Sequence, residues 1–186
     1  MSINLAKGST INLQKNDPKL QKVFIGLGWE YLMEGIDLDA SLFMLGANGK
    51  LIHDNYFIFY NNLTSPDGSV MHQGDNRTGL GNDDDELILA SLRQVDTKVM
   101  EIHIYVSIHD AVQRGHTFGR LKDAYIRIVN VENSVEVLKY DLDANQGFAT
   151  EVLFGKLKRV NDTEWEFQAV GQGSTNGLQS IVNKYV

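Results

Sequence analysis

Apolar and polar residues alternate along much of this chain with a period of two, which is typical of half-buried β-strands. The clearest run is 100–108, in which Glu101, His103, Tyr105 and Ser107 alternate with apolar residues. Further alternating or β-rich runs cover residues 23–27, 38–45, 56–60, 125–131, 135–140 and 165–170. Turn residues separate the runs at Asn48-Gly49, Pro66-Asp67-Gly68, Asn133-Ser134 and Asn161-Asp162. Many short strands with spaced turns favour an antiparallel β-sandwich.

One helix is predicted, at the C-terminal end of the chain. Apolar side chains recur there at helical spacing, at Leu178, Ile181, Val182, Tyr185 and Val186, so one face of the helix would be apolar. No linker, charge block or low-complexity tract divides the 186 residues. The pattern therefore predicts a single domain over 1–186, a mainly all-β antiparallel sandwich with a short C-terminal helix.

Composition narrows the classes of function. The net charge is −7 and no cluster of Lys or Arg offsets it, which argues against binding nucleic-acid phosphates. The chain has no cysteine, so disulfides, thiolate zinc sites and thiol redox chemistry are excluded. No apolar run has the length of a signal peptide or a membrane span. We expect a soluble protein that acts in the cytoplasm.

Residues 74–86 are the most acidic segment of the chain. They combine glycines and a single Arg77 with seven carboxylate or amide side chains: Asp75, Asn76, Asn82, Asp83, Asp84, Asp85 and Glu86. Hard oxygen donors in a glycine-rich loop suit Ca²⁺, which takes six to eight oxygen ligands. The alternative is a solvated acidic turn, the usual structure of a charge run. The segment is not an EF-hand, because Arg77 and Leu80 occupy the third and sixth positions.

Three further carboxylates are expected at strand ends. Asp37 and Asp39 are two residues apart at the start of the 38–45 run, so they would point to one face of a strand. Asp110 follows the 100–108 run directly. Carboxylates from separate loops at one end of a sandwich could converge on an ion. The alternative is that all three are turn or capping residues.

Catalytic and histidine patterns are weak. His103 and His109 would share a strand face about 20 Å apart, too far for one metal, and the other histidines have no partner at ligand spacing. No serine lies in a Gly-x-Ser-x-Gly elbow, and the glycine-rich stretches lack the sequence of a phosphate-binding loop. We predict no catalytic residues, no organic cofactor and no enzymatic activity.

A series of motifs runs along nearly the whole chain: 23–29 (VFIGLGW), 37–43 (DLDASLF), 57–63 (FIFYNNL), 65–70 (SPDGSV), 74–79 (GDNRTG), 84–86 (DDE), 108–110 (IHD), 118–119 (FG), 124–127 (AYIR), 140–142 (YDL) and 169–173 (AVGQG). Together, and in this order, they resemble the TerD family of tellurite-resistance and calcium-binding bacterial stress proteins.

The resemblance implies a β-sandwich that binds one or two Ca²⁺ ions and protects against tellurite and other stresses, with no established catalytic reaction. It places metal ligands at Asp75, Asn76, Gly79, Gly81, Asp84, Asp85 and Glu86, with Asp37, Asp39 and Asp110 close by. The chain departs from the family at Leu80 and at Asn82-Asp83, where the family usually has an acidic residue and Asp-Gly. This change would weaken one site, move a ligand, or leave a single strong site. The segment 29–35 is also shortened.

The absence of cysteine excludes direct reduction of tellurite by a thiol of this chain. We therefore favour a Ca²⁺-dependent interaction or scaffold module that binds other proteins of a stress or tellurite-resistance assembly, including membrane-associated ones. A Ca²⁺-dependent binder of membrane surfaces or carbohydrates is one alternative. A metal-dependent hydrolase, in which carboxylates hold an ion and a water, is the other.

Overall fold

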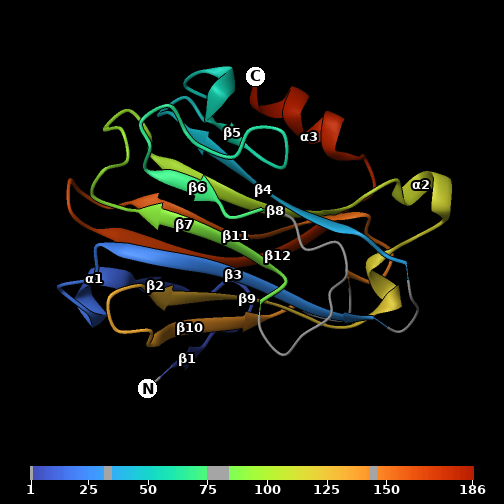
Figure 1. Cartoon of the computed structure of the whole chain (residues 1–186), viewed down its shortest axis with the longest axis horizontal. Helices are drawn as coiled ribbons and strands as arrows, with labels where there is room; N and C mark the ends of the chain where they lie inside the picture. Colours follow the sequence, from blue (N-terminus) through green and yellow to red (C-terminus); the bar gives the residue numbers. More distant parts are fainter. Residues whose placement is uncertain (1, 32–34, 75–83, 143–145) are drawn as a thin grey trace.

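Two β-sheets packed face to face form two layers of strands (Figure 1). The computed structural model describes residues 2–31, 35–74, 84–142 and 146–186. Within them the first sheet contains, in spatial order, β1 (Ile3–Asn4), β10 (Glu136–Asp141), β9 (Leu121–Asn130), β3 (Lys22–Tyr31), β7 (Glu86–Ser91) and β6 (Val70–His72). The second contains β2 (Thr10–Asn12), β12 (Trp165–Ser174), β11 (Glu151–Arg159), β8 (Glu101–Ile108), β4 (Leu38–Leu45) and β5 (Phe57–Ile58).

Neighbouring strands pair antiparallel, except that β1 pairs parallel to β10. In the first sheet β3 lies between β7 and β9, and in the second β8 lies between β4 and β11. This architecture confirms the antiparallel β-sandwich that the sequence predicts.

Short helices connect the strands. The α-helices are α1 (Leu13–Asn16), α2 (Ala111–Arg114) and α3 (Leu178–Tyr185), and the 3₁₀ turns are η1 (Asp54–Tyr56) and η2 (Phe118–Arg120). The terminal helix is therefore confirmed at the predicted place. None of the helices in the described ranges is long and apolar enough to cross a membrane.

The main core lies between the sheets. Alternate residues of each strand face inward, such as Ile25 and Ile88 from the first sheet and Ile104 and Trp165 from the second, all fully buried. Burying each such side chain stabilises the fold by about 1.5–3 kcal/mol. This core fixes the strand register that positions the polar residues described below.

A second apolar cluster lies on the outer face of the second sheet, under α3. Ile181 and Tyr185 of α3 pack there against Phe43, Phe57 and Tyr105. The main chain fastens the helix as well, because Leu51 N donates to Tyr185 O at 2.7 Å. The helix therefore buries residues of β8 that the alternating pattern places on its polar side.

The predicted strand at 56–60 is wrong in its extent. Tyr56 ends the 3₁₀ turn η1, and only Phe57–Ile58 form β5 against β4. Asn62 Nδ2 donates to Phe57 O at 2.7 Å, and Phe59 and Asn62 form an isolated bridge. The aromatic run is thus folded into a turn that contributes Phe57 to the cluster under α3.

Candidate metal centre

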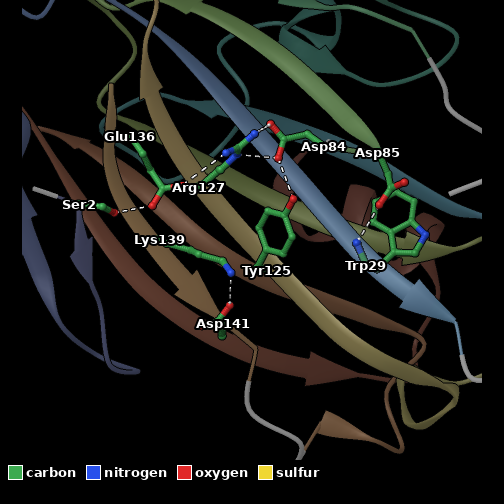
Figure 2. Close-up of polar contacts among 9 residues, drawn as sticks. All are labelled: Ser2, Trp29, Asp84, Asp85, Tyr125, Arg127, Glu136, Lys139 and Asp141. Atoms are coloured by element: carbon green, nitrogen blue, oxygen red, sulfur yellow. Dashed lines mark hydrogen bonds and ion pairs between the residues drawn. The ribbon is translucent and has the colours of Figure 1, made fainter. Parts of the chain in front are cut away.

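The acidic segment enters the described structure at Asp84, just before β7 (Figure 2). Of the predicted ligands, Asp75, Asn76, Gly79 and Gly81 lie outside the described residues. Asp84, Asp85 and Glu86 are described, and their carboxylates have three separate sets of partners.

Asp84 forms a two-pronged ion pair with Arg127 of β9. Arg127 Nε donates to Asp84 Oδ1 at 2.8 Å and Nη2 donates to Oδ2 at 3.0 Å. The Tyr125 hydroxyl also donates to Oδ1, at 3.1 Å. The Asp84 side chain is only 8% exposed. Both of its oxygens are therefore engaged by protein donors, in the parallel geometry that makes Arg–carboxylate pairs strong.

Two glycines of β3 make space for this pair. A Cβ atom at Gly26 would lie 2.1 Å from Asp84 Oδ2, and one at Gly28 would lie 2.4 Å from Tyr125 Cζ. Neither glycine has a positive φ. They are needed for close approach rather than for backbone conformation. The Asp84 carboxylate and the Tyr125 ring thus lie directly on the β3 main chain.

Charged side chains continue across the outer face of the first sheet. Glu136 Oε2 lies 3.5 Å from Arg127 Nη1, and the Lys139 ammonium lies 4.4 Å from the centre of the Tyr125 ring. Burial, together with the charge of Asp84, raises the pKa of Tyr125 to about 12, so its hydroxyl remains a donor at neutral pH. The hydrogen bonds and charge of Asp84 raise the pKa of Arg127.

Asp85 caps the main chain of β3 instead. Its Oδ2 accepts from Trp29 N at 2.8 Å, and its own amide donates to Leu27 O at 2.8 Å. Oδ1 accepts no hydrogen bond from the described residues. Burial raises the pKa of Asp85, the Trp29 amide lowers it, and the charge of Asp84 raises it, with a net increase. A nearby positive charge would stabilise the ionised form of this carboxylate.

Glu86 points into the sandwich. It alternates with Ile88 and Ala90 on the inner face of β7 and is 1% exposed. Its Oε2 lies 3.0 Å from Nε2 of His72, which is also buried. This contact could not be predicted from the sequence, because the pairing of β6 with β7 brings the two residues together.

The described carboxylates do not form a complete metal site. Among residues 2–31, 35–74, 84–142 and 146–186, no group of three or more His, Asp or Glu side chains could hold a metal ion. Asp85 has the properties of a calcium ligand, since it is a desolvated carboxylate and its Oδ1 accepts no hydrogen bond from the described residues. Both oxygens of Asp84 accept hydrogen bonds from Arg127, and Oδ1 accepts one from Tyr125 as well. A Ca²⁺ shell of six to eight oxygens needs further donors besides Asp85.

A second acidic group forms where β4 begins and β8 ends. Asp39 Oδ2 lies 3.4 Å from His109 Nδ1, and Asp110 Oδ2 lies 3.5 Å from His109 Nε2. The main chain contributes too, since His109 N donates to Asp37 O at 2.8 Å. The structure thus brings Asp37, Asp39 and Asp110 to one place. It adds His109, which the sequence analysis weighed only as a partner of His103.

An open pocket of about 330 Å³ adjoins this group and includes Asp39, Tyr60, His109, Asp110 and Glu151 in its lining. Glu151 is a buried carboxylate that the sequence analysis missed. Its Oε1 accepts from Ser174 Oγ and Asn176 N, both at 2.6 Å, and from Gly177 N at 3.0 Å. These bonds fix the connection between β12 and α3. Glu151 therefore shapes the pocket through the main chain.

Asp110 has a left-handed backbone conformation, with φ 50° and ψ 31°. Asp adopts this region more readily than most residues, though at some cost in free energy. The turn carries the chain from β8 into α2, where Arg114 Nη2 lies 3.9 Å from Asp110 Oδ2. It directs the Asp110 side chain toward His109.

Comparison with known proteins gives full-length matches. The TerD domain family matches residues 1–185. The tellurium resistance protein TerD of Serratia marcescens is 48% identical over 188 residues, covering 100% of this chain and 97% of that protein. General stress protein 16U of Bacillus subtilis (strain 168) is 42% identical over 189 residues, covering 100% of this chain and 97% of that protein.

A solved structure has the same fold. It is that of a homologue of telluride resistance protein (TerD) from Streptomyces coelicolor A3(2), with a TM-score of 0.69 and 20% sequence identity. The match covers 88% of this chain and 95% of that one. At this identity the likeness concerns the fold alone.

Proposed function

The chain belongs to the TerD family, and on this premise we propose that it is a Ca²⁺-binding stress-response protein of the tellurite-resistance type. Its role is that of a Ca²⁺-dependent interaction or scaffold module for other proteins of a stress assembly in the cytoplasm. Relatives named for tellurium resistance and for general stress support the biological setting.

The observation that carries the calcium proposal is the state of Asp85. This carboxylate is 7% exposed, stands at the end of the most acidic segment, and has a pKa raised by burial and by Asp84. A bound cation would supply the positive charge that favours its ionised form. Oxygen donors without a nearby thiol favour Ca²⁺ over Zn²⁺, and a glycine-rich loop favours it over octahedral Mg²⁺.

A binding role rather than a catalytic one is supported by the partners of the neighbouring carboxylates. Arg127 and Tyr125 engage Asp84, and His72 contacts Glu86 in the interior. Carboxylates held by protein partners in this way stabilise the fold, and they are poorly placed to exchange protons with a substrate.

A second function, Ca²⁺-dependent binding of a small hydroxylated ligand such as a carbohydrate, is favoured by the pocket beside Asp39 and Asp110. Carboxylates, His109 and the partly exposed ring of Tyr60 line it. Glycan binding that requires Ca²⁺ and is lost in Tyr60→Ala would promote this function over the protein scaffold. Glycan arrays without signal in either metal state would remove it.

Titration calorimetry tests the calcium proposal. We expect wild-type protein to bind Ca²⁺ more tightly than Mg²⁺. Trp29 gives a second signal, because its main-chain amide donates to Asp85. A Trp165→Phe variant leaves Trp29 as the one tryptophan of the sequence. Its tryptophan fluorescence should change on adding Ca²⁺ and revert with chelator. Absent heat, or Mg²⁺ binding as tight as Ca²⁺ binding, contradicts the proposal.

The interaction role has its own test. Tagged protein incubated with cell extract should retain partner proteins in Ca²⁺ and release them in chelator. An Asp85→Asn variant, which keeps the shape of the side chain without its charge, should retain fewer of them. Identical sets of retained proteins under all conditions would leave a calcium-binding protein without a calcium-dependent interaction.

A further inference from the structure

Asp84 differs from Asp85 and Glu86 in forming a two-pronged ion pair, with Arg127. Two parallel hydrogen bonds of 2.8 and 3.0 Å join Asp84 to Arg127, and Tyr125 supplies a third donor. A Ca²⁺ ligand needs a free oxygen lone pair facing the ion. Here Oδ1 accepts from both Arg127 and Tyr125, while Oδ2 accepts from Arg127 and lies against the main chain at Gly26 (Figure 2). The charge of Asp84 is therefore already neutralised without a metal.

Gly26 of β3 provides the space that this pair occupies. Gly26 lies directly across from both Leu87 of β7 and Arg127 of β9 in the strand register. Arg127 thus reaches over β3 at the position where the side chain is missing. Any Cβ at Gly26 would occupy the place of the Asp84 carboxylate. The contact joins β9, β3 and the start of β7.

The position of the pair in the chain gives it a consequence for metal binding. Asp84 directly precedes Asp85 in the chain. From Asp85 onward the main chain is bonded to β3, beginning with Asp85 N to Leu27 O. The Asp84–Arg127 pair therefore holds the residue that directly precedes Asp85, and with it the place of the Asp85 carboxylate.

We propose that Asp84 is not a calcium ligand, and that Asp84 and Arg127 together are positioning residues that hold Asp85 in place for Ca²⁺. The inference rests on the proposed calcium site and names how that site is held. Gly26 belongs to the same arrangement, because the absence of a side chain there leaves room for the Asp84–Arg127 pair. Of these two neighbouring carboxylates, Asp85 then binds the metal and Asp84 anchors the chain beside it.

The direction in which one substitution changes the Ca²⁺ affinity separates this inference from the alternative, in which Asp84 is itself a ligand. Arg127→Gln removes a positive charge near a cation site, and by Coulomb's law alone it should tighten Ca²⁺ binding. If Asp84 were a ligand, freeing it from Arg127 would tighten binding further. If the pair positions Asp85, the same change weakens Ca²⁺ binding, by about 10-fold or more, as loss of a residue that supports a ligand does.

The experiment is a double-substitution cycle measured by calorimetry with Ca²⁺ as the titrant. Asp84→Asn and Arg127→Gln should each weaken binding to a similar extent, and the double variant should be little worse than either. Lys139→Gln is the matched control, since it removes a positive charge from the same sheet face without touching Asp84. It should leave the affinity unchanged or slightly tighter. Arg127→Lys, which keeps the charge, should restore part of the affinity.

Hydrogen exchange of the Ca²⁺-free protein gives an independent readout. The amide of Asp85 should exchange faster in Arg127→Gln than in wild type, while amides of β8 keep their protection. If either variant fails to fold, Tyr125→Phe removes one hydrogen bond and should shift both readouts less, in the same direction.

Tighter or unchanged Ca²⁺ binding in Arg127→Gln overturns the inference, and so does a double variant whose loss equals the product of the two single losses. Wild-type protein that binds no Ca²⁺ contradicts the proposed function instead. In that case the exchange of the Asp85 amide still decides whether the pair anchors the segment.

Discussion

Asp84, Asp85 and Glu86 are consecutive carboxylates with three different environments. Asp84 lies on the outer face of the first sheet with Arg127, Asp85 accepts from the Trp29 amide, and Glu86 points inward to His72. At the scale of single residues, the composition of an acidic segment does not specify the environment of each carboxylate, because each one meets a different partner in the fold.

Gly26 should tolerate no side chain. In Gly26→Ala the new Cβ would lie 2.1 Å from Asp84 Oδ2, so the carboxylate must leave Arg127 or the strand must shift. Such overpacking typically costs about 1–3 kcal/mol, measurable by urea denaturation. Combining it with Asp84→Ala removes the clash, so the cost of Gly26→Ala should be smaller in that background. An equal cost in both backgrounds would contradict the assigned contact.

Asp85 and Asp67 should separate metal affinity from stability. Burial alone would raise the pKa of Asp67, but hydrogen bonds from Ser65, the Asp96 amide and Ser69 outweigh it and hold the pKa below its ordinary value. Asp67→Asn should therefore lower the free energy of unfolding at pH 7 by about 1–3 kcal/mol and leave the Ca²⁺ affinity unchanged. Asp85→Asn should weaken Ca²⁺ strongly. Similar losses of affinity in both variants would place the metal elsewhere.

His103 should make the stability depend on pH. Burial lowers its pKa from the ordinary 6.5 to about 4, although Glu101 opposes the shift. Between these values the unfolded chain binds a proton that the folded protein does not, so stability falls as the pH is lowered from 6.5 toward 4. The full effect is roughly 3 kcal/mol.

The measurement for His103 is urea denaturation at pH 7 and pH 4.5 in wild type and His103→Gln. Wild type should lose more stability on acidification, by roughly 2–3 kcal/mol, because the variant lacks the titrating group. An identical loss in both proteins would mean that His103 titrates normally in the folded state.

At the scale of elements, strands with long alternating patterns could be predicted and strands defined by their partners could not. The run at 38–45 matches β4, and 100–108 matches β8 to within one residue. β6 has only three residues, and β7 begins inside the acidic run, so neither has a clear pattern of its own. β11 was missed because Val152, Leu153 and Phe154 are buried on both faces.

The inner faces of β8 and β11 are buried in the main core. The docking of α3 buries the outer faces of both strands. The apolar face of α3 was evident from the sequence, but the surface that it covers was not. His103 and Tyr105 have polar atoms, and these are satisfied under α3 by the Tyr185 hydroxyl, at 2.8 and 3.0 Å. Polarity alone therefore suggested an exposed strand face where the fold has a second apolar cluster.

The docking of α3 predicts a large effect at Ile181, which is buried against the second sheet. Ile181→Ala should destabilise the protein by about 2–4 kcal/mol and increase binding of a hydrophobic dye as the cluster under α3 becomes accessible. Gln179→Ala, on the exposed side of the same helix, should stay within about 0.5 kcal/mol of wild type. If the two substitutions cost the same, α3 does not pack as described.

The site was predictable only in part, for a similar reason. Its acidic residues stand out in composition, but His109 and Arg127 are brought to them by strand register. His109 meets Asp39 because β4 pairs antiparallel with β8, and Arg127 meets Asp84 across Gly26. These contacts join residues that are distant in sequence. They follow from the fold rather than from any local motif.

At the scale of the whole molecule, the net charge of −7 concentrates repulsion where carboxylates gather. Arg127 offsets part of this charge within the described residues. A bound divalent cation would offset more of it in the folded state. Since the unfolded chain has no assembled site, Ca²⁺ binding should be linked directly to stability.

Thermal denaturation with and without Ca²⁺ tests this account most directly. At a hundredfold excess over Kd, a ligand specific to the folded state stabilises it by roughly 2.7 kcal/mol. For a domain of this size, that corresponds to a rise in Tm of about 5–10 °C. We expect saturating Ca²⁺ to produce this rise, chelator to abolish it, and equimolar Mg²⁺ to produce a smaller one. A Tm that is the same in Ca²⁺ and in chelator would contradict the calcium site and leave the acidic segment as a solvated turn.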